Sequence, residues 1–166
     1  ASRIAVRHVR QLVGPEKPFL IAGYSNGGAL AVRYVFEALE DTTLPAVNRL
    51  VLLSPEIGVM RVAALAVWQA RLGRMLALRK LQWNDILPEF DPFKYGSFAI
   101  NAGDLSYRLT AENKSSLANT KTKEKRIKFP PVLAFQSAVD KTVSTKAVVE
   151  DLFMQLPPNE SELVLF

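Results

Sequence analysis

Hydrophobic residues in this chain gather in short continuous runs, and stretches of helical period separate these runs. Short apolar runs bounded by turn residues are typical of strands that are buried on both faces. The runs cover residues 19–22, 49–53, 132–135 and 162–166, and the helical stretches cover residues 2–12, 26–40 and 144–156. Strands that alternate with helices in this way predict an α/β fold, a parallel sheet flanked by helices on both faces.

A compact glycine–serine motif lies at the junction between the first strand and the second helix. Gly23, Ser25 and Gly27 match the spacing G-x-S-x-G, and a further glycine, Gly28, follows. This spacing is typical of a nucleophile elbow, a strand-to-helix turn so sharp that small residues are needed two positions before and two after the serine. Backbone N–H groups at the start of the helix can stabilise an oxyanion. The motif therefore predicts Ser25 as a nucleophile and the N–H of Asn26 as an oxyanion donor; an ordinary turn with an incidental serine is the alternative.

With these residues the stretch resembles the α/β-hydrolase superfamily, and within it the serine esterases and lysophospholipase-like hydrolases. The resemblance implies cleavage of carboxylic acyl esters through an acyl-enzyme, without a cofactor, by a triad in the chain order Ser…Asp…His. Asp140 follows the strand at 132–135 and precedes a helix, which is where this family carries the triad acid. The pair Ser137-Ala138 stands where the family often has a glycine. A turn-forming or helix-capping aspartate is the alternative interpretation of Asp140.

The expected histidine is missing from its expected place. The sequence has one histidine, His8, which lies in the first predicted helix and is best interpreted as a surface residue. The strands that open the family's fold, with the loop that supplies its second oxyanion donor, would precede this helix. The resemblance thus implies that the chain corresponds to the later half of the fold. The strand before Ser25 would then lie at a sheet edge, and an open apolar edge favours self-association or pairing with a missing segment.

The middle of the chain, residues 57–128, interrupts the alternation of strands and helices with amphipathic helical stretches, an aromatic loop and no convincing strand. In α/β-hydrolases an insertion at this place forms a cap over the active site. The resemblance therefore implies a helical cap at 57–128 within a single domain of residues 1–166. The aromatic residues expected to line an acyl pocket are Tyr24, Trp68, Trp83, Phe90 and Phe93. Filling the cap's own core is the alternative role for them, and a membrane surface is a less favoured site for the basic helix.

Composition and charge exclude several other classes of protein. Most of the net charge of +5 lies in the lysine-rich stretch 121–128, which has no interleaved aromatic residues and no nucleic-acid motif and so indicates a solvated connector. The absence of cysteine excludes a disulfide framework and a thiolate metal site. No stretch has the pattern of a signal peptide or the length of a membrane span, so we expect a cytoplasmic location.

Three functions remain open from the sequence. The favoured one is a serine hydrolase that acts on small-molecule acyl esters, with Ser25 and Asp140 as catalytic residues and with no metal. A peptidase or amidase of the same fold is the second. The third is a catalytically inactive remnant that serves as a binding or association module, which the missing histidine would explain.

Overall fold

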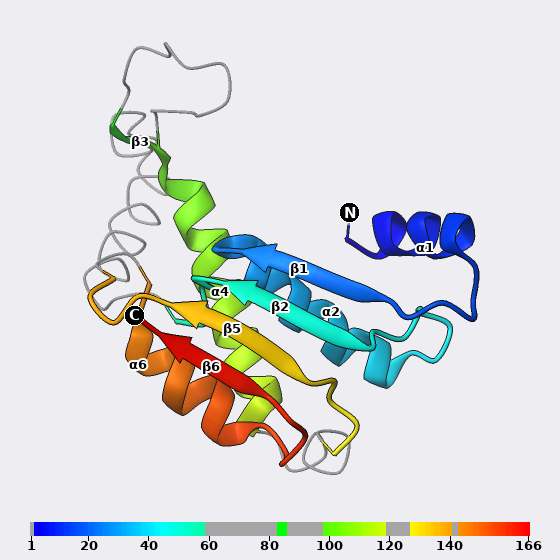
Figure 1. Ribbon diagram of the computed structural model, residues 1–166. Helices are drawn as coiled ribbons and strands as arrows, with labels where there is room; N and C mark the ends of the chain where they lie inside the picture. The colour runs from blue at the N-terminus through cyan, green and yellow to red at the C-terminus, as the bar shows by residue number, and fades with distance from the viewer. Residues whose placement is uncertain (1, 59–82, 86–97, 119–126, 141–142) are drawn as a thin grey trace. The chain divides into compact units, whose positions relative to one another are not determined.

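The computed structural model describes residues 2–58, 83–85, 98–118, 127–140 and 143–166 (Figure 1). The chain forms two compact units, one from residues 1–58 and 109–166 and one from residues 59–108. The first unit holds a four-stranded parallel sheet in the order β1 (Leu20–Tyr24), β2 (Arg49–Leu53), β5 (Val132–Gln136) and β6 (Glu162–Leu165). The second unit holds the antiparallel pair β3 (Trp83–Asp85) and β4 (Phe98–Ala99).

Helices cover one face of the four-stranded sheet. Figure 1 shows α2 (Asn26–Glu40), the C-terminal half of α4 (Ile100–Ala118) and α6 (Thr145–Ala147) on the same side of the strands. The chain continues from α6 as a π-helical turn (Val148–Leu152) and a 3-10 turn (Phe153–Gln155). The core between these helices and the sheet contains Val32, Val35, Phe36, Leu50, Leu52, Leu117, Val132, Ala134, Val148 and Leu152.

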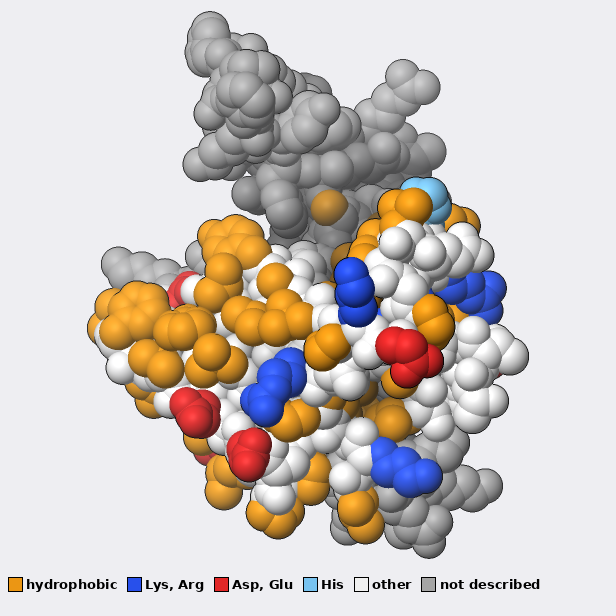
Figure 2. Space-filling view, turned by 45° about the vertical axis from the view of Figure 1, so that its right-hand side comes forward, with side chains coloured by type: hydrophobic (Ala, Val, Ile, Leu, Met, Phe, Trp, Pro, Cys, Tyr) orange, Lys and Arg blue, Asp and Glu red, His pale blue; other side chains and the backbone are white. Residues whose placement is uncertain are grey.

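The opposite face of the sheet is apolar and uncovered among the described residues. Residues that are paired across parallel strands share a face, and one such row joins Tyr24, Leu53, Phe135 and Val164. Tyr24 is 71% exposed, Leu53 42% and Val164 40%. Figure 2 shows hydrophobic side chains gathered on this side of the described chain. In the described part of the chain, the predicted cover of helices on both faces is therefore found on one face only, although parallel sheets are normally buried on both.

The predicted elements agree with the structure where the sequence is strongly periodic. The helix at 26–40 has the predicted bounds, and each predicted strand of the sheet is present within two residues of its expected ends. Ser144 caps the predicted C-terminal helix by accepting a hydrogen bond from the N–H of Ala147, but that helix is broken into α, π and 3-10 turns. The prediction that the middle segment has no strand is wrong, because β3 and β4 pair there. These strands span three and two residues, too few to show any alternation in the sequence.

Helix α1 (Ser2–Val13) is attached to the rest of its unit by polar side chains, since none of its residues is buried. Arg3 Nε donates to Glu37 Oε2 at 2.7 Å, and Arg7 donates to Thr43 Oγ1 at 3.2 Å. The hydrogen bond from Arg3 is the main cause that lowers the pKa of Glu37 below its ordinary value.

We expect the attachment of α1 to weaken in acid. Because the pKa of Glu37 is lowered in the folded state, its stabilising contribution is present above the unfolded-state pKa and is lost as the pH falls through the folded-state value. Glu37→Gln should therefore speed amide exchange in α1 at neutral pH. In that variant, lowering the pH should reduce the protection of the α1 amides little further. Glu40→Gln, at the exposed end of α2, the helix that also carries Glu37, is the matched control. Equal exchange in both variants would contradict this role of Glu37.

Candidate active site

Ser25 lies at the junction of β1 and α2 with a backbone conformation that is rare for a non-glycine residue, φ 51° and ψ −120°. Such a conformation costs about 1–3 kcal/mol and persists only where the surroundings fix it. Here the N–H of Ser25 donates to the carbonyl of Leu53 at 3.0 Å, which continues the β1–β2 pairing. The carbonyl of Ser25 accepts from the N–H groups of Gly28 and Glu56, each at 3.0 Å. The sharp strand-to-helix turn predicted from the glycines is present at Ser25, and we call it the elbow. Hydrogen bonds on both sides of Ser25 hold its strained backbone in place.

Close backbone contacts explain two of the three motif glycines. A Cβ atom on Gly23 would lie 2.6 Å from the carbonyl oxygen of Gly27 and 2.7 Å from backbone atoms of Gly28. A Cβ atom on Gly28 would lie 2.7 Å from Cβ of Pro55. Among the described residues, nothing lies within 4 Å of a Cβ atom on Gly27. The expectation that the residue two after the serine must be small is therefore corrected: the tight positions are two before and three after it.

The turn that follows β2 supports the elbow from the side. Ser54 also has a positive φ, 42°, and its N–H donates to the carbonyl of Phe135 at 2.8 Å. Two residues later the N–H of Glu56 binds the Ser25 carbonyl, and the buried Pro55 packs against Gly28. No sequence pattern marks these residues, because their role depends on contacts between two neighbouring strand ends.

Asp140 lies in the loop after β5, at the sheet edge where the strands have their carboxyl ends. Its Oδ1 accepts from the N–H of Val143 at 3.0 Å, and its Oδ2 accepts from Nε2 of Gln136 at 3.3 Å. The bond to Val143 is what a turn-forming aspartate makes, while anchoring of both oxygens also suits a group that must orient a base. Both interpretations of Asp140 therefore remain compatible with its contacts.

The strand order sets the spacing between the two candidate catalytic residues. β2 separates β1 from β5, so the strands that precede Ser25 and Asp140 are two spacings apart, about 10 Å. A hydrogen bond spans less than a third of that distance. This strand spacing is compatible with a third group between the two side chains, which is the arrangement of a Ser–base–acid triad. Asn26 opens α2, at the end of the helix where the dipole favours negative charge.

His8 lies on exposed helix α1, at the far end of α2 from the elbow. The contacts of α1 reach Glu37, which is eleven residues beyond Asn26 and so about 16 Å along the helix. This placement fits a surface histidine. Tyr24 is exposed on the open face of the sheet beside Ser25, and Trp83 belongs to β3 in the other unit. Trp68, Phe90 and Phe93 lie outside the described residues.

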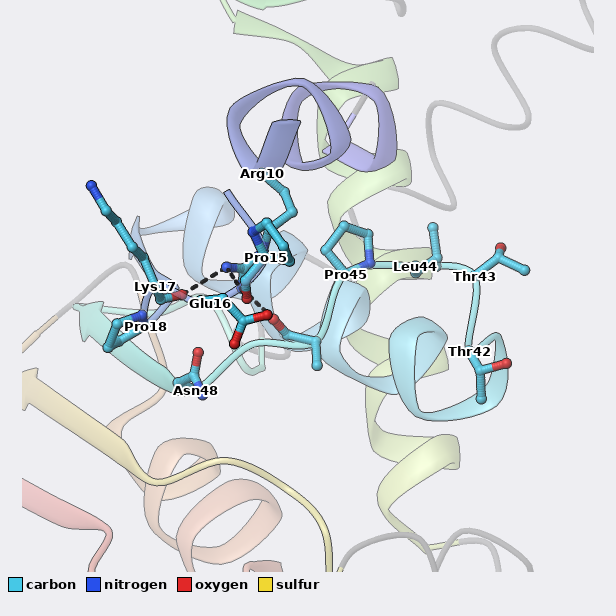
Figure 3. A pocket seen from close by; sticks show the side chains of 11 residues that line it. Arg10, Pro15, Glu16, Lys17, Pro18, Thr42, Thr43, Leu44, Pro45 and Asn48 are labelled. Atoms are coloured by element: carbon cyan, nitrogen blue, oxygen red, sulfur yellow. Dashed lines mark hydrogen bonds between the residues drawn. The ribbon is translucent and has the colours of Figure 1, made fainter. Parts of the chain in front are cut away.

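A hollow of about 460 Å³ lies at the amino ends of β1 and β2, opposite the elbow (Figure 3). Arg10 occupies its centre and donates to the carbonyls of Lys17 at 2.7 Å and Ala46 at 3.2 Å. The guanidinium also lies 4.6 Å from the ring centroid of Phe19. These contacts use the charge of Arg10 to join the loop before β1 to the loop before β2.

The described part of the chain has no group of three or more histidine, cysteine, aspartate or glutamate side chains that could hold a metal ion. In the same part, no helix has both the length and the apolar character needed to cross a membrane.

No protein-family model matches the chain, and no curated protein matches it significantly. Solved structures do match. A soluble variant of monoglyceride lipase from Saccharomyces cerevisiae superimposes with a TM-score of 0.63 at 14% sequence identity, over 98% of this chain and 57% of the lipase. The chain has the α/β-hydrolase fold.

Two further structures show how widely this fold is used. One belongs to the metagenome-derived lipolytic enzymes LipS and LipT, with a TM-score of 0.59, 15% identity, and cover of 97% of this chain and 60% of that one. Another is homoserine O-acetyltransferase from Bacillus anthracis, with a TM-score of 0.53, 13% identity, and cover of 99% and 57%. The chain spans just over half the length of these hydrolase-fold proteins, and likeness at such identities establishes the fold alone.

Proposed function

We propose that this chain carries the nucleophile and the acid of a serine hydrolase that cleaves carboxylic acyl esters. The observation that carries the proposal is the strained backbone of Ser25, which hydrogen bonds hold in place between β1 and α2. Strain that the surroundings fix so firmly is typical of functional sites. The esterases and lipases among the structural neighbours support the choice of an ester substrate.

The proposed reaction has two steps. The Ser25 hydroxyl attacks the ester carbonyl and gives its proton to a base, which passes it to the departing alcohol. Water then attacks the acyl-enzyme by the same route and releases the acid. The N–H of Asn26 stabilises the oxyanion, and loss of one such donor costs roughly 3–4 kcal/mol. Asp140 orients the base. We propose that a histidine from further polypeptide supplies this base, because His8, the one histidine of the sequence, lies far from the elbow.

An active-site-directed phosphonate tests the proposal, because it reacts with an activated serine and leaves a covalent label. We expect the label on Ser25 in the native protein that carries this chain. Ser54→Ala is the matched control: Ser54 follows the next strand and also has a positive φ, yet its loss should leave labelling of Ser25 unchanged. Labelling at another serine, or none at all, would overturn the proposal.

The distance of His8 from the elbow favours one alternative, an inactive hydrolase-fold module that only binds or associates. That module would fold with the same strained Ser25 and would stay unlabelled by the phosphonate. A peptidase or amidase would be labelled as well, and comparison of matched ester and amide substrates separates it from an esterase. For an esterase, we propose that residues 57–128 form a cap whose Trp68, Trp83, Phe90 and Phe93, together with Tyr24, line the acyl pocket.

We also propose that the open edge of β1 and the apolar face of the sheet pair with further polypeptide, either another segment of the protein or a second copy of the chain. The edge presents unpaired backbone groups of a five-residue strand. Beside it, the uncovered face carries apolar side chains from all four strands. Exposed apolar patches of this kind mark sites of association.

We expect the isolated 166-residue chain to self-associate in size-exclusion chromatography with light scattering. Leu20→Lys with Val164→Lys places charge on the open face and should shift the chain toward the monomer. Met154→Lys, at a more exposed position on a turn of the helical layer, should not. A monomeric wild-type chain with full hydrolytic activity would contradict the proposed pairing.

A further inference from the structure

Gln136, the last residue of β5, is a fully buried amide directly beneath the loop that carries Asp140. We infer that Gln136 is a positioning residue that holds the Asp140 carboxylate in one orientation at the carboxyl edge of the sheet. The inference rests on the proposed function and extends it to a residue that no sequence motif marks.

The contacts of Gln136 define which end of its amide faces the loop. Nε2 lies 3.2 Å from the carbonyl oxygen of Ser137, 3.3 Å from Asp140 Oδ2 and 3.4 Å from Thr145 Oγ1. A carbonyl and a carboxylate can only accept hydrogen bonds, so the amino group must be the end that points at them. The Thr145 hydroxyl itself donates to the Ser137 carbonyl at 2.9 Å. The side chains at both ends of the loop that carries Asp140, those of Gln136 and Thr145, therefore bind the same carbonyl oxygen.

The opposite end of the amide supports a functional role. Oε1 of Gln136 is buried and has no hydrogen-bond partner among the residues that the structure describes. A buried polar atom left without a partner costs stability, which an apolar side chain of the same length would avoid. This loss of stability falls on the residue that binds Asp140. Such a loss is expected where the amino group of Gln136 has a role in the functional site.

Two separate elements thus hold the two oxygens of Asp140. Gln136 reaches Oδ2 from the end of a central strand, and the N–H of Val143 reaches Oδ1 from the far end of the loop. A carboxylate accepts about four hydrogen bonds, so it can still receive the N–H of a base while both anchors are in place. An anchor on the rigid strand fixes the direction in which the carboxylate is presented, and small errors in such directions reduce catalytic rates.

Gln136→Met tests the inference, because methionine matches the length of glutamine and lacks the N–H donor. In the native protein we expect kcat for a short acyl ester to fall roughly ten- to hundredfold with KM little changed. Gln155→Met removes an exposed amide that donates to the carbonyl of Glu150, and should leave kcat unchanged. If packing were the only role of Gln136, methionine would preserve kcat.

A spectroscopic measurement keeps the inference testable where no hydrolysis is found. In the wild-type protein, the side-chain amide resonances of Gln136 should shift with the titration of Asp140, since the two groups are hydrogen bonded. In Gln136→Met the pKa of Asp140 should rise, because the charged carboxylate loses a donor. Asp41, which is held by Thr43, is the internal control. An Asp140 titration unaffected by Gln136→Met, together with a Gln136 amide that does not follow it, would overturn the inference. Activity that survives Ser25→Ala would overturn only the proposed function.

Discussion

Ser25→Ala should lower ester hydrolysis by the native protein at least roughly a thousandfold while its fold is retained. The reason is that alanine removes the attacking oxygen but keeps the backbone hydrogen bonds of the elbow, which involve only the N–H and carbonyl of residue 25. Loss of a nucleophile of this type leaves only the contribution of the oxyanion donors and of substrate binding. Initial rates with a short acyl ester, and circular dichroism on the same samples, check both parts of the prediction.

Ser25→Gly also removes the attacking oxygen and should in addition stabilise the fold relative to the wild type. Glycine adopts positive φ without strain, so this variant should be inactive and yet more stable, by about 1 kcal/mol. Undiminished activity in either variant would exclude Ser25 as the nucleophile. A Gly variant no more stable than the Ala variant would show that the backbone at residue 25 stores no strain.

Gly23→Ala should be the most destabilising single change in the elbow. The added methyl would lie 2.6 Å from a backbone oxygen and 2.7 Å from two backbone atoms of α2, none of which can move without shifting the helix against the strand. We expect a loss of about 3 kcal/mol or more in the free energy of unfolding, measured by urea denaturation.

Gly27→Ala is the matched control for this experiment, since it adds the same methyl four residues away, where no atom of the described residues lies within 4 Å. Residue 27 lies in the first turn of α2, where alanine favours the helix by about 0.5–1 kcal/mol over glycine. The two variants should therefore move the urea midpoint in opposite directions. Equal losses in both would contradict the packing described for Gly23.

The sequence was sufficient to predict the features that depend on neighbours along the chain. The apolar run before Gly23 and the periodic stretch after Ser25 locate β1, the elbow and α2, because each of these features depends on residues that are close together in the sequence. The support that Glu56 and Pro55 give to the elbow could not be predicted, since it joins two strand ends some thirty residues apart in sequence. The same is true of Gln136, whose partner loop must fold back before its amide meets Asp140.

The last helix shows a different limit. Residues 144–156 have a regular apolar spacing, and Ser144 caps the N-terminus of this helix. The hydrogen-bond pattern then widens to a π-helical turn and tightens to a 3-10 turn, while Val148 and Leu152 stay buried in the core. The apolar pattern specifies which side chains face the sheet, and it does not distinguish among helical types that satisfy the same burial.

Because β1 lies at the border of the described sheet, a further strand could pair beside the elbow. A strand added in parallel beside β1 would end one spacing, about 4.8 Å, from the strand that carries Ser25, closer than the strand that carries Asp140. Its terminal loop would therefore form half of the surroundings of the serine. If that strand came from a separate molecule, the specific rate of hydrolysis would fall on dilution, as the law of mass action requires for an assembled site. If it came from the same molecule, dilution would leave the specific rate constant.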